Sequence, residues 1–233
     1  MVISSSEWFV PADVPLHMES DFRDNGKLIT NNTNNIMLFA VDHKITHLND
    51  DFYGASIAKD ALDPEHIFRI ASHGSIGALA TYPGLIARYG KRYNSIPYVA
   101  ILNAKMPLLK EHDPMSASLL DVEQLISFKQ DVGLAIVGVA ISIYLGALDQ
   151  QEMISYASQT IYHAHQYGLI TFLFIDKNDN SRQEKEFAPG AAGLATSLGA
   201  DFVKIKTPYH DNTIDIEELG RTVIAAGTTL LFI

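Results

Sequence analysis

The sequence predicts an α/β fold, a (β/α)8 barrel of the TIM type that is incomplete at its C-terminus. From residue 36 onward, short apolar runs alternate with longer helix-like stretches. Most of these runs are continuously apolar, as expected of parallel strands covered on both faces. A closed barrel and an open doubly wound sheet both fit this alternation. No strand candidate runs into a G-x-G-x-x-G turn or a G-x-x-x-x-G-K-[ST] loop, which favours the barrel.

The strand candidates begin after a polar N-terminal segment. Residues 1–35 end in an asparagine-rich stretch, so we expect an irregular N-terminal extension ahead of a barrel domain over residues 36–233. The expected strands are Ile36–Asp42, Ile76–Ala80, Tyr98–Leu102, Ala135–Ile143, Ile170–Ile175, Phe202–Lys206 and Thr228–Phe232. A complete barrel has eight strands, so the last β/α elements are expected to be missing from this chain.

Helices are expected between the strands, and several carry terminal signals. The segment Asp63-Pro64-Glu65 combines a capping residue, a proline and a first-turn acid at one helix start. Further helices are expected over residues 117–130, 149–167, 189–198 and 215–226. Gly168, Gly199 and Gly227 follow the last three and are typical C-terminal stops.

Composition and charge exclude several classes of protein. The chain has 27 acidic and 17 basic residues, a net charge of −10, so neither nucleic acid nor an anionic membrane is an expected partner. It contains no cysteine, which excludes disulfides, thiolate catalysis and cysteine-based zinc sites. Residues 1–11 lack the features of a signal peptide, and no apolar run is long enough to span a membrane. We therefore expect a cytoplasmic protein.

Polar residues at the ends of the predicted strands are the candidates for chemistry, because barrel enzymes place catalytic groups there. Asp42 ends the first strand, Tyr144 follows the fourth, and Lys204 and Lys206 lie on one face of the sixth. A lysine amine that burial keeps neutral can attack a carbonyl and form a Schiff base, while a tyrosine or carboxylate moves protons. The alternative is that both lysines lie at a solvated strand end.

The histidines do not indicate a metal site. His43 and His47 match no zinc spacing, and His163 and His165 are spaced by two on a predicted helix, so they point to different faces. We expect no metal and no cofactor.

Three strand-end motifs, in this order and spacing, resemble one enzyme family. Residues Asp42–His47 read Asp-His-Lys-Ile-Thr-His, residues Ile143–Ala147 read Ile-Tyr-Leu-Gly-Ala, and residues Gly199–Lys204 read Gly-Ala-Asp-Phe-Val-Lys. The segment Asp63–His66 resembles the first barrel helix of the same family. The chain is thereby identified as similar to the class I fructose-bisphosphate aldolases of the archaeal and bacterial DhnA type, from about Glu7 onward.

This resemblance implies a metal-independent lyase of glycolysis or gluconeogenesis that cleaves a phosphorylated sugar, often as a homo-oligomer. By position, Lys204 would form the Schiff base, with Lys206 as the alternative nucleophile. Tyr144 would donate or accept a proton, and Asp42 would assist proton transfer. His47 would line the substrate site.

The chain departs from the family pattern at three places. Where the family has Lys-Leu-Asn after strand three, this chain has Ile101-Leu102-Asn103, and Lys105 is the candidate replacement cation beside Asn103 in the substrate site. Lys44 replaces a glycine and is expected to place a cation beside Asp42. The Ser-Gly-Gly and Gly-Arg phosphate-binding segments have no counterpart.

These departures leave two alternatives to fructose 1,6-bisphosphate cleavage. One is a lyase or transferase of the same type that acts on another phosphorylated carbonyl substrate. The other is a degenerate barrel that binds partners without catalysis.

Overall fold

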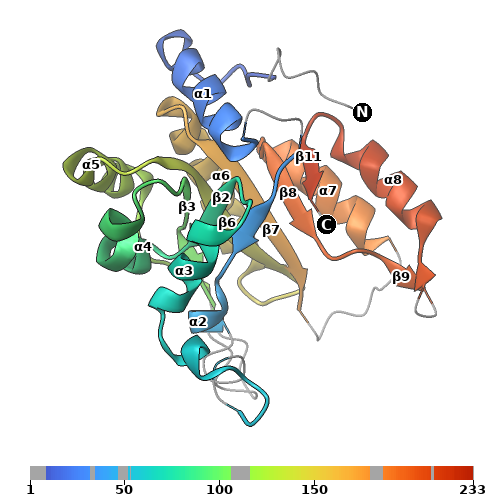
Figure 1. Cartoon of the computed structure of the whole chain (residues 1–233). Coiled ribbons are helices and arrows are strands. Elements are labelled where there is room, and N and C mark those ends of the chain that lie inside the picture. The colour runs from blue at the N-terminus through green and yellow to red at the C-terminus, as the bar shows by residue number, and fades with distance from the viewer. Residues whose placement is uncertain are drawn as a thin grey trace.

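Strands and helices alternate along the chain in the computed structural model of the protein (Figure 1). The structure describes residues 9–31, 35–46, 52, 54–105, 116–178, 186–210 and 213–232. The main sheet contains β1 (Leu38–Ala40), β2 (Ala78–Thr81), β3 (Tyr98–Ile101), β6 (Ile136–Leu145), β7 (Ile170–Lys177), β8 (Phe202–Ile205) and β11 (Leu230–Phe232). The described α-helices are α1 (Glu19–Ile29), α2 (His43–Thr46), α3 (Glu65–His73), α4 (Pro83–Tyr89), α5 (Val122–Val132), α6 (Gln150–Gln166), α7 (Phe187–Leu198) and α8 (Ile216–Ala226).

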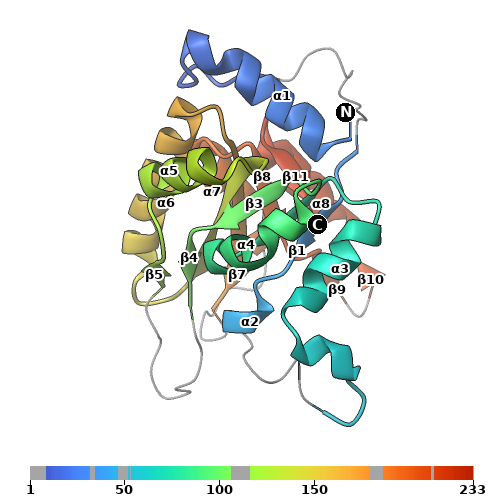
Figure 2. The same ribbon diagram turned by 60° about the vertical axis from the view of Figure 1, so that its left-hand side comes forward.

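The seven strands form one sheet that curls into part of a barrel with helices on its outside (Figure 2). The order is β1-β2-β3-β6-β7-β8-β11, and every neighbouring pair is parallel. Two short antiparallel pairs lie outside this sheet: β4 (Asn103–Ala104) with β5 (Ala117–Ser118), and β9 (Tyr209–His210) with β10 (Thr213–Ile214). The predicted incomplete (β/α)8 barrel with seven strands is confirmed.

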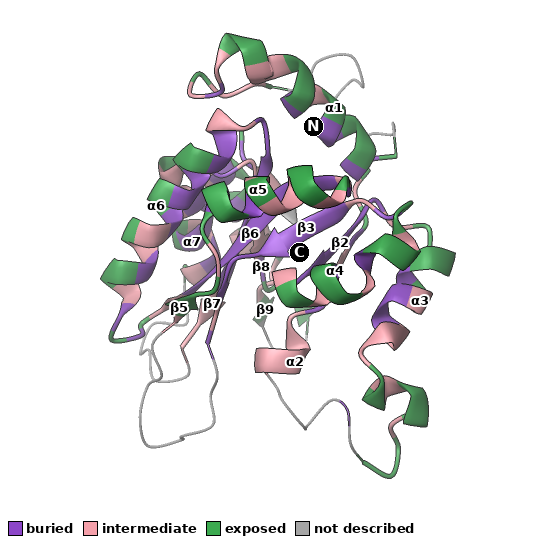
Figure 3. Ribbon diagram, turned by 90° about the vertical axis from the view of Figure 1, so that its left-hand side faces the viewer, coloured by how far each residue is buried: buried purple, intermediate pink, exposed green. Residues whose placement is uncertain are grey.

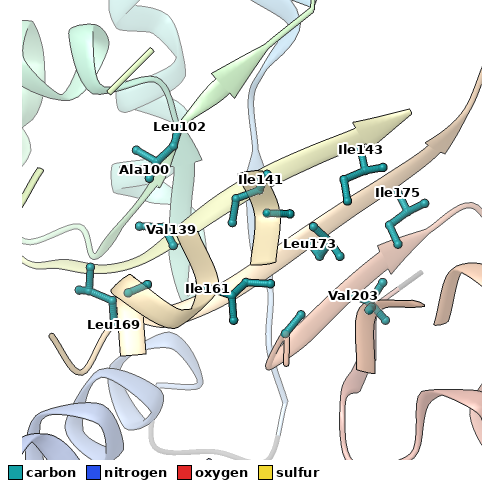
Figure 4. Close-up of a cluster of buried hydrophobic side chains, with 14 of the residues drawn as sticks. Ala100, Leu102, Val139, Ile141, Ile143, Ile161, Leu169, Leu173, Ile175 and Val203 are labelled. Atoms are coloured by element: carbon teal, nitrogen blue, oxygen red, sulfur yellow. The ribbon is translucent and has the colours of Figure 1, made fainter. Parts of the chain in front are cut away.

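The sheet separates two apolar layers, which explains why its strands are apolar on both faces (Figure 3). On the outer face, Ile141, Leu173 and Val203 from three strands gather near Ile161 of α6 (Figure 4). On the inner face, Phe172 and Phe202 stack with ring centroids 4.7 Å apart. Side chains alternate between the two faces along each strand. The residues that continue the inner-face series toward the C-terminal strand ends therefore point into the barrel mouth.

Most predicted elements are present, with shifted ends. The helix expected over residues 117–130 instead begins at Val122, because Asp121 and Gln124 form a reciprocal capping box at its N-terminus. Residues Ala117 and Ser118, placed in that helix by the sequence prediction, form β5 instead. The helix α4 between β2 and β3 was not predicted; it begins with Pro83 at its first position.

The irregular N-terminal extension predicted over residues 1–35 is wrong for its described part, which contains α1. Phe22, Asn25, Gly26 and Ile29 recur at helical spacing and are all buried. The Asn25 amide donates to the Gly168 carbonyl at 2.8 Å, just before β7 begins. The helix α1 therefore lies at the N-terminal end of the strands, away from α2 (Figure 1). Treating residues 1–35 as separate from the barrel domain remains a prediction.

A buried histidine joins the segment before α1 to the barrel. The His165 side chain is fully buried, with Nδ1 2.9 Å from Asp13 Oδ2 and Nε2 3.2 Å from Asp201 Oδ2. Asp201 also accepts hydrogen bonds from the backbone N–H and the hydroxyl of Thr171, each at 2.8 Å. Burial lowers the pKa of His165, but the hydrogen bonds and charges of Asp201 and Asp13 outweigh burial, and the pKa is raised overall.

This network predicts a pH-dependent stability. A pKa that is higher in the folded than in the unfolded state stabilises the fold fully below the unfolded value of about 6.5. That stabilisation is lost as the pH rises through the raised folded pKa of His165. We expect the free energy of unfolding, measured in urea at several pH values above about 6, to fall with rising pH.

The matched control for this measurement is His163, two residues away. His163 is exposed and pairs with Glu123 on the surface. His165→Gln should destabilise the protein by about 3 kcal/mol, the scale for breaking a buried charged network, and should remove the pH dependence. His163→Gln should leave it in place. An equal slope in wild type and His165→Gln would refute the assignment.

Candidate active site

Polar side chains replace apolar ones where the inner face reaches the C-terminal ends of the strands. Along β7 the inner-face series runs Phe172, Phe174, Asp176, and along β8 it runs from Phe202 to Lys204. The register pairs Tyr144 with Asp176 and Phe174 with Lys204 on neighbouring strands. The period of two therefore brings groups from distant parts of the chain to one end of the barrel.

These groups surround a cavity of about 420 Å³ at the barrel mouth. It is lined by Asp42, His43, Thr46, Lys105, Tyr144, Asp176, Lys177, Asn178, Lys204 and Lys206. The cavity thus brings together five of the seven residues that the sequence singled out. Of the other two, Asn103 lies outside the lining, and His47 falls outside the described residues.

Lys204 of β8 and Lys206, one residue beyond the end of β8, share the mouth of the cavity but differ in environment. The Lys204 ammonium lies 5.2 Å from the centroid of the Phe174 ring, and the residue is partly buried. The Lys206 side chain is 89% exposed, with Nζ 3.7 Å from Asp176 Oδ1. Lys204 thus contacts the apolar inner face, whereas Lys206 lies at the solvent rim.

Tyr144 is half-buried, and charged side chains lie near it. Burial, and then the carboxylates of Asp176 and Asp42, raise the pKa of Tyr144, against a smaller opposing effect of a hydrogen bond with Ser142. The phenol is therefore protonated at neutral pH and is a proton donor. The Lys105 ammonium lies 4.9 Å from the centroid of its ring, and Lys105 is only 7% exposed. A buried cation and a protonated phenol thus lie together at the cavity wall.

Asn103 fixes the strand that carries Tyr144. Its amide donates to the Ser142 carbonyl and accepts from the Ser142 N–H, both at 2.8 Å, and it also donates to the Ser116 hydroxyl at 2.9 Å. The nitrogen and the oxygen of the Asn103 amide thus both bind the backbone of Ser142, two residues before Tyr144. The geometry favours a positioning role over the substrate contact that the sequence suggested.

Lys44 does not point its ammonium at the cavity. Its Nζ donates to the Ala61 carbonyl at 3.0 Å and lies 3.3 Å from the centroid of the Phe52 ring. Burial lowers its pKa, against the charge of Asp63. The expected cation beside Asp42 is therefore wrong. The nearby group is instead His43, whose Nδ1 lies 3.9 Å from Asp42 Oδ1.

Asp176, Lys177 and Asn178 line the cavity and were missed by the sequence analysis. The predicted strand ended at Ile175, where the apolar run ends, whereas β7 continues to Lys177. The available signal was the alternation itself, because Asp176 follows Phe172 and Phe174 on the same face.

No cluster of three His, Cys, Asp or Glu side chains suited to a metal ion occurs in the part of the chain that the structure describes. Among those same residues, no helix has the length and apolar character needed to cross a membrane.

A family model matches most of the chain. Residues 36–229 match the family described as DeoC/LacD family aldolase. A relative from Methanocaldococcus jannaschii, named fructose-bisphosphate aldolase/6-deoxy-5-ketofructose 1-phosphate synthase, is 44% identical over 223 residues. That alignment covers 94% of this chain and 71% of the relative. A probable class 1 fructose-bisphosphate aldolase from Chlamydia trachomatis is 26% identical, and this chain spans about half of its length, 51%.

Two solved aldolase structures have folds similar to that of this chain. A fructose-bisphosphate aldolase from Slackia heliotrinireducens superposes with a TM-score of 0.92 at 37% identity, covering 98% of this chain and 74% of that one. A Schiff base-forming fructose-1,6-bisphosphate aldolase gives a TM-score of 0.73 at 24% identity, covering 91% and 79%. This second likeness concerns the fold alone.

Proposed function

Since the chain belongs to the DeoC/LacD aldolase family, we propose that it is a class I aldolase with Lys204 as the Schiff-base lysine. The proposed reaction cleaves fructose 1,6-bisphosphate, or a related phosphorylated ketose, into triose phosphates. The observation that carries this proposal is the meeting of Lys204, Tyr144 and Asp42 around one cavity at the strand ends. A nucleophile, a proton donor and a carboxylate are the groups that amine-catalysed aldol cleavage requires.

The covalent phase begins with the neutral Lys204 amine adding to the substrate carbonyl. The resulting carbinolamine loses its hydroxyl as water after receiving a proton, and a protonated Schiff base remains. We assign this proton to Tyr144, because its raised pKa keeps the phenol protonated. Lys204 thereby becomes the electron sink for the next step.

Cleavage then breaks the bond between C3 and C4 of the ketose. A base removes the proton of the C4 hydroxyl, C4 leaves as an aldehyde, and the bonding electrons form an enamine with the lysine nitrogen. We assign the base to Asp42, the carboxylate at the end of β1 that lines the same cavity. Protonation of the enamine at C3 and hydrolysis of the Schiff base release the second product and restore the amine.

Other residues are proposed to bind the substrate or to hold the catalytic groups in place. Lys105 supplies a buried cation on the cavity wall, on the strand-three segment where the family lysine is replaced by Ile101. Lys206 supplies a cation at the rim, and Asn103 holds Ser142 and, through it, the strand that carries Tyr144. His47 remains a proposed substrate contact.

The test of this function is direct. Purified protein should cleave fructose 1,6-bisphosphate into two triose phosphates, measured by coupled reduction of dihydroxyacetone phosphate, at a rate that a chelator leaves unchanged. Failure to release triose phosphate from any phosphorylated ketose would overturn the proposal.

A second candidate keeps the lysine chemistry and changes the carbonyl substrate. It is favoured by Ile101, and by the second half of the name of the M. jannaschii relative, which describes synthesis of a deoxy-ketose phosphate. A panel of phosphorylated ketoses and acceptor aldehydes separates the two, since the second candidate predicts faster bond formation with a non-phosphorylated aldehyde. The non-catalytic reading is disfavoured because the three reactive groups share one cavity.

We further propose that the enzyme is cytoplasmic and forms homo-oligomers, as the family resemblance implies. Light scattering on the purified protein tests the second point, since a monomer has a mass of 25.7 kDa.

A further inference from the structure

The orientation of Asp42 depends on α2, the single helical turn that follows it. The backbone N–H groups of Ile45 and Thr46 donate to the Asp42 carbonyl at 3.1 and 3.2 Å, and the Thr46 hydroxyl donates to the same oxygen at 3.2 Å. His43 and Thr46 of this turn line the cavity together with Asp42. A shift of α2 would therefore move one wall of the cavity and the carboxylate assigned as the base.

A turn of four residues needs tertiary contacts, because the nucleation of a helix is unfavourable. One contact is made by Ile45, which packs against the inner-face core. The other is made by Lys44, whose Nζ donates to the Ala61 carbonyl at 3.0 Å and lies 3.3 Å from the centroid of the buried Phe52 ring. Ala61 belongs to the 3₁₀ helix η2 (Lys59–Leu62), in the cyan segment beside α2 that leads into α3 (Figure 1). Lys44 thus joins α2 to this segment.

The Lys44 ammonium is partly withdrawn from water. Burial lowers its pKa, and the charge of the Asp63 carboxylate opposes this effect. Asp63 follows η2 directly and accepts hydrogen bonds from Arg69 at 2.8 Å and from the Glu65 N–H at 3.0 Å, so the segment is itself fixed to α3. Hydrogen bonds and cation–π contacts are stronger where water is excluded. The contacts of Lys44 therefore stabilise the position of α2.

We propose that Lys44 is a positioning residue for the reaction, which holds α2 so that the Asp42 carboxylate points at the substrate. This inference rests on the proposed function, in which Asp42 removes the proton of the C4 hydroxyl. Placement matters because a displacement of about 1 Å can cost about 100-fold in rate. Lys44 stands where the family pattern has glycine, which could make neither side-chain contact.

A double-mutant cycle tests this role. Lys44→Met removes the ammonium and keeps an unbranched stem, and kcat for fructose 1,6-bisphosphate cleavage should fall by about 10- to 100-fold. In an Asp42→Asn background the same substitution should change kcat by less than about 2-fold, because no carboxylate remains to be misplaced. Lys59→Met, at an exposed lysine of η2, should leave kcat at the wild-type value. Equal losses in both backgrounds would overturn the proposal, since Lys44 would then act independently of Asp42.

Schiff-base formation separates positioning from a general structural defect. In the proposed mechanism the Lys204 amine adds to the substrate carbonyl before Asp42 acts. Borohydride reduction should therefore trap the substrate on Lys204 at the wild-type rate in Lys44→Met, although cleavage is slow. Trapping that falls in parallel with kcat would contradict the proposal.

Hydrogen exchange tests the same contact without turnover. In Lys44→Met the Ile45 and Thr46 amides should exchange at least about 10-fold faster, the scale for losing a hydrogen bond to a charged group. The Val41 amide, which bonds to β2, should be unaffected. If wild type cleaves no ketose, the proposed function fails, and this measurement still decides whether Lys44 holds α2. Unchanged exchange at Ile45 and Thr46 would overturn this inference alone. Should Lys44→Met not fold, Phe52→Leu is measured in its place, with the same direction expected.

Discussion

Lys204→Ala is expected to lower kcat for fructose 1,6-bisphosphate cleavage by about four to six orders of magnitude, the scale for removing a covalent nucleophile. Lys204 is placed for this role by its partly buried position beside the Phe174 ring, at the inner end of the cavity. Without its amine no Schiff base forms, and the C3–C4 bond has no electron sink. The measurement is steady-state release of triose phosphate.

Two further variants make this result specific. Lys204→Arg keeps a cation but has no neutral amine at working pH, so it should be as inactive as Lys204→Ala. Lys91→Ala should retain wild-type turnover, because that lysine is exposed outside the cavity. Activity above about 1% in Lys204→Ala would contradict the assignment, given the expected scale.

Tyr144→Phe is expected to lower kcat by about 100- to 10,000-fold, the range for removing a positioned proton donor. In the proposed mechanism the phenol donates to the departing carbinolamine hydroxyl, and the substitution removes only the phenol oxygen. KM should change little, because the loss occurs in the transition state. Stopped assays at saturating substrate measure this effect directly.

The pH dependence of kcat and a variant of a second tyrosine serve as controls for this experiment. Because burial and the carboxylates of Asp176 and Asp42 raise the pKa of Tyr144, no loss of kcat from its ionisation should occur near neutral pH. Tyr162 is 53% exposed on α6, and Tyr162→Phe should behave as wild type. A Tyr144→Phe enzyme with unchanged kcat and raised KM would assign the phenol to binding.

The sequence predicted the strands well, for a physical reason. In this sheet both faces are covered, so a strand such as β3 is continuously apolar and stands out in composition. The strand ends were predicted less well. β6 and β7 continue past their apolar runs to Leu145 and Lys177, where the inner face becomes polar. Three residues of the cavity lining, Tyr144, Asp176 and Lys177, lie in these extensions.

The site was predicted in part, by residue spacing and by family resemblance. The period of two placed Lys204 and Lys206 on one face, and the cavity contains both. Asp176 was missed because the predicted strand ended two residues before β7 does. The contacts of Asn103 and Lys44 depend on Ser142 and Ala61, which are distant in sequence, so no local pattern indicates them.

The helix α1 was missed because its composition is mostly polar. Only Phe22 and Ile29 are large apolar residues on its buried face, and Gly26 lowers the helix propensity of the segment. Its stability comes from packing against the inner-face core and from the Asn25 bond to Gly168. Local helix propensity does not reveal tertiary contacts of this kind.

Borohydride reduction in the presence of substrate tests whether Lys204 forms the Schiff base. Reduction converts a protein-bound Schiff base into a stable secondary amine, and peptide mass mapping then locates the modified lysine. We expect one substrate-dependent adduct on Lys204 and its loss in Lys204→Ala. An adduct on Lys206 instead, or no adduct while the enzyme cleaves fructose 1,6-bisphosphate, would contradict this assignment.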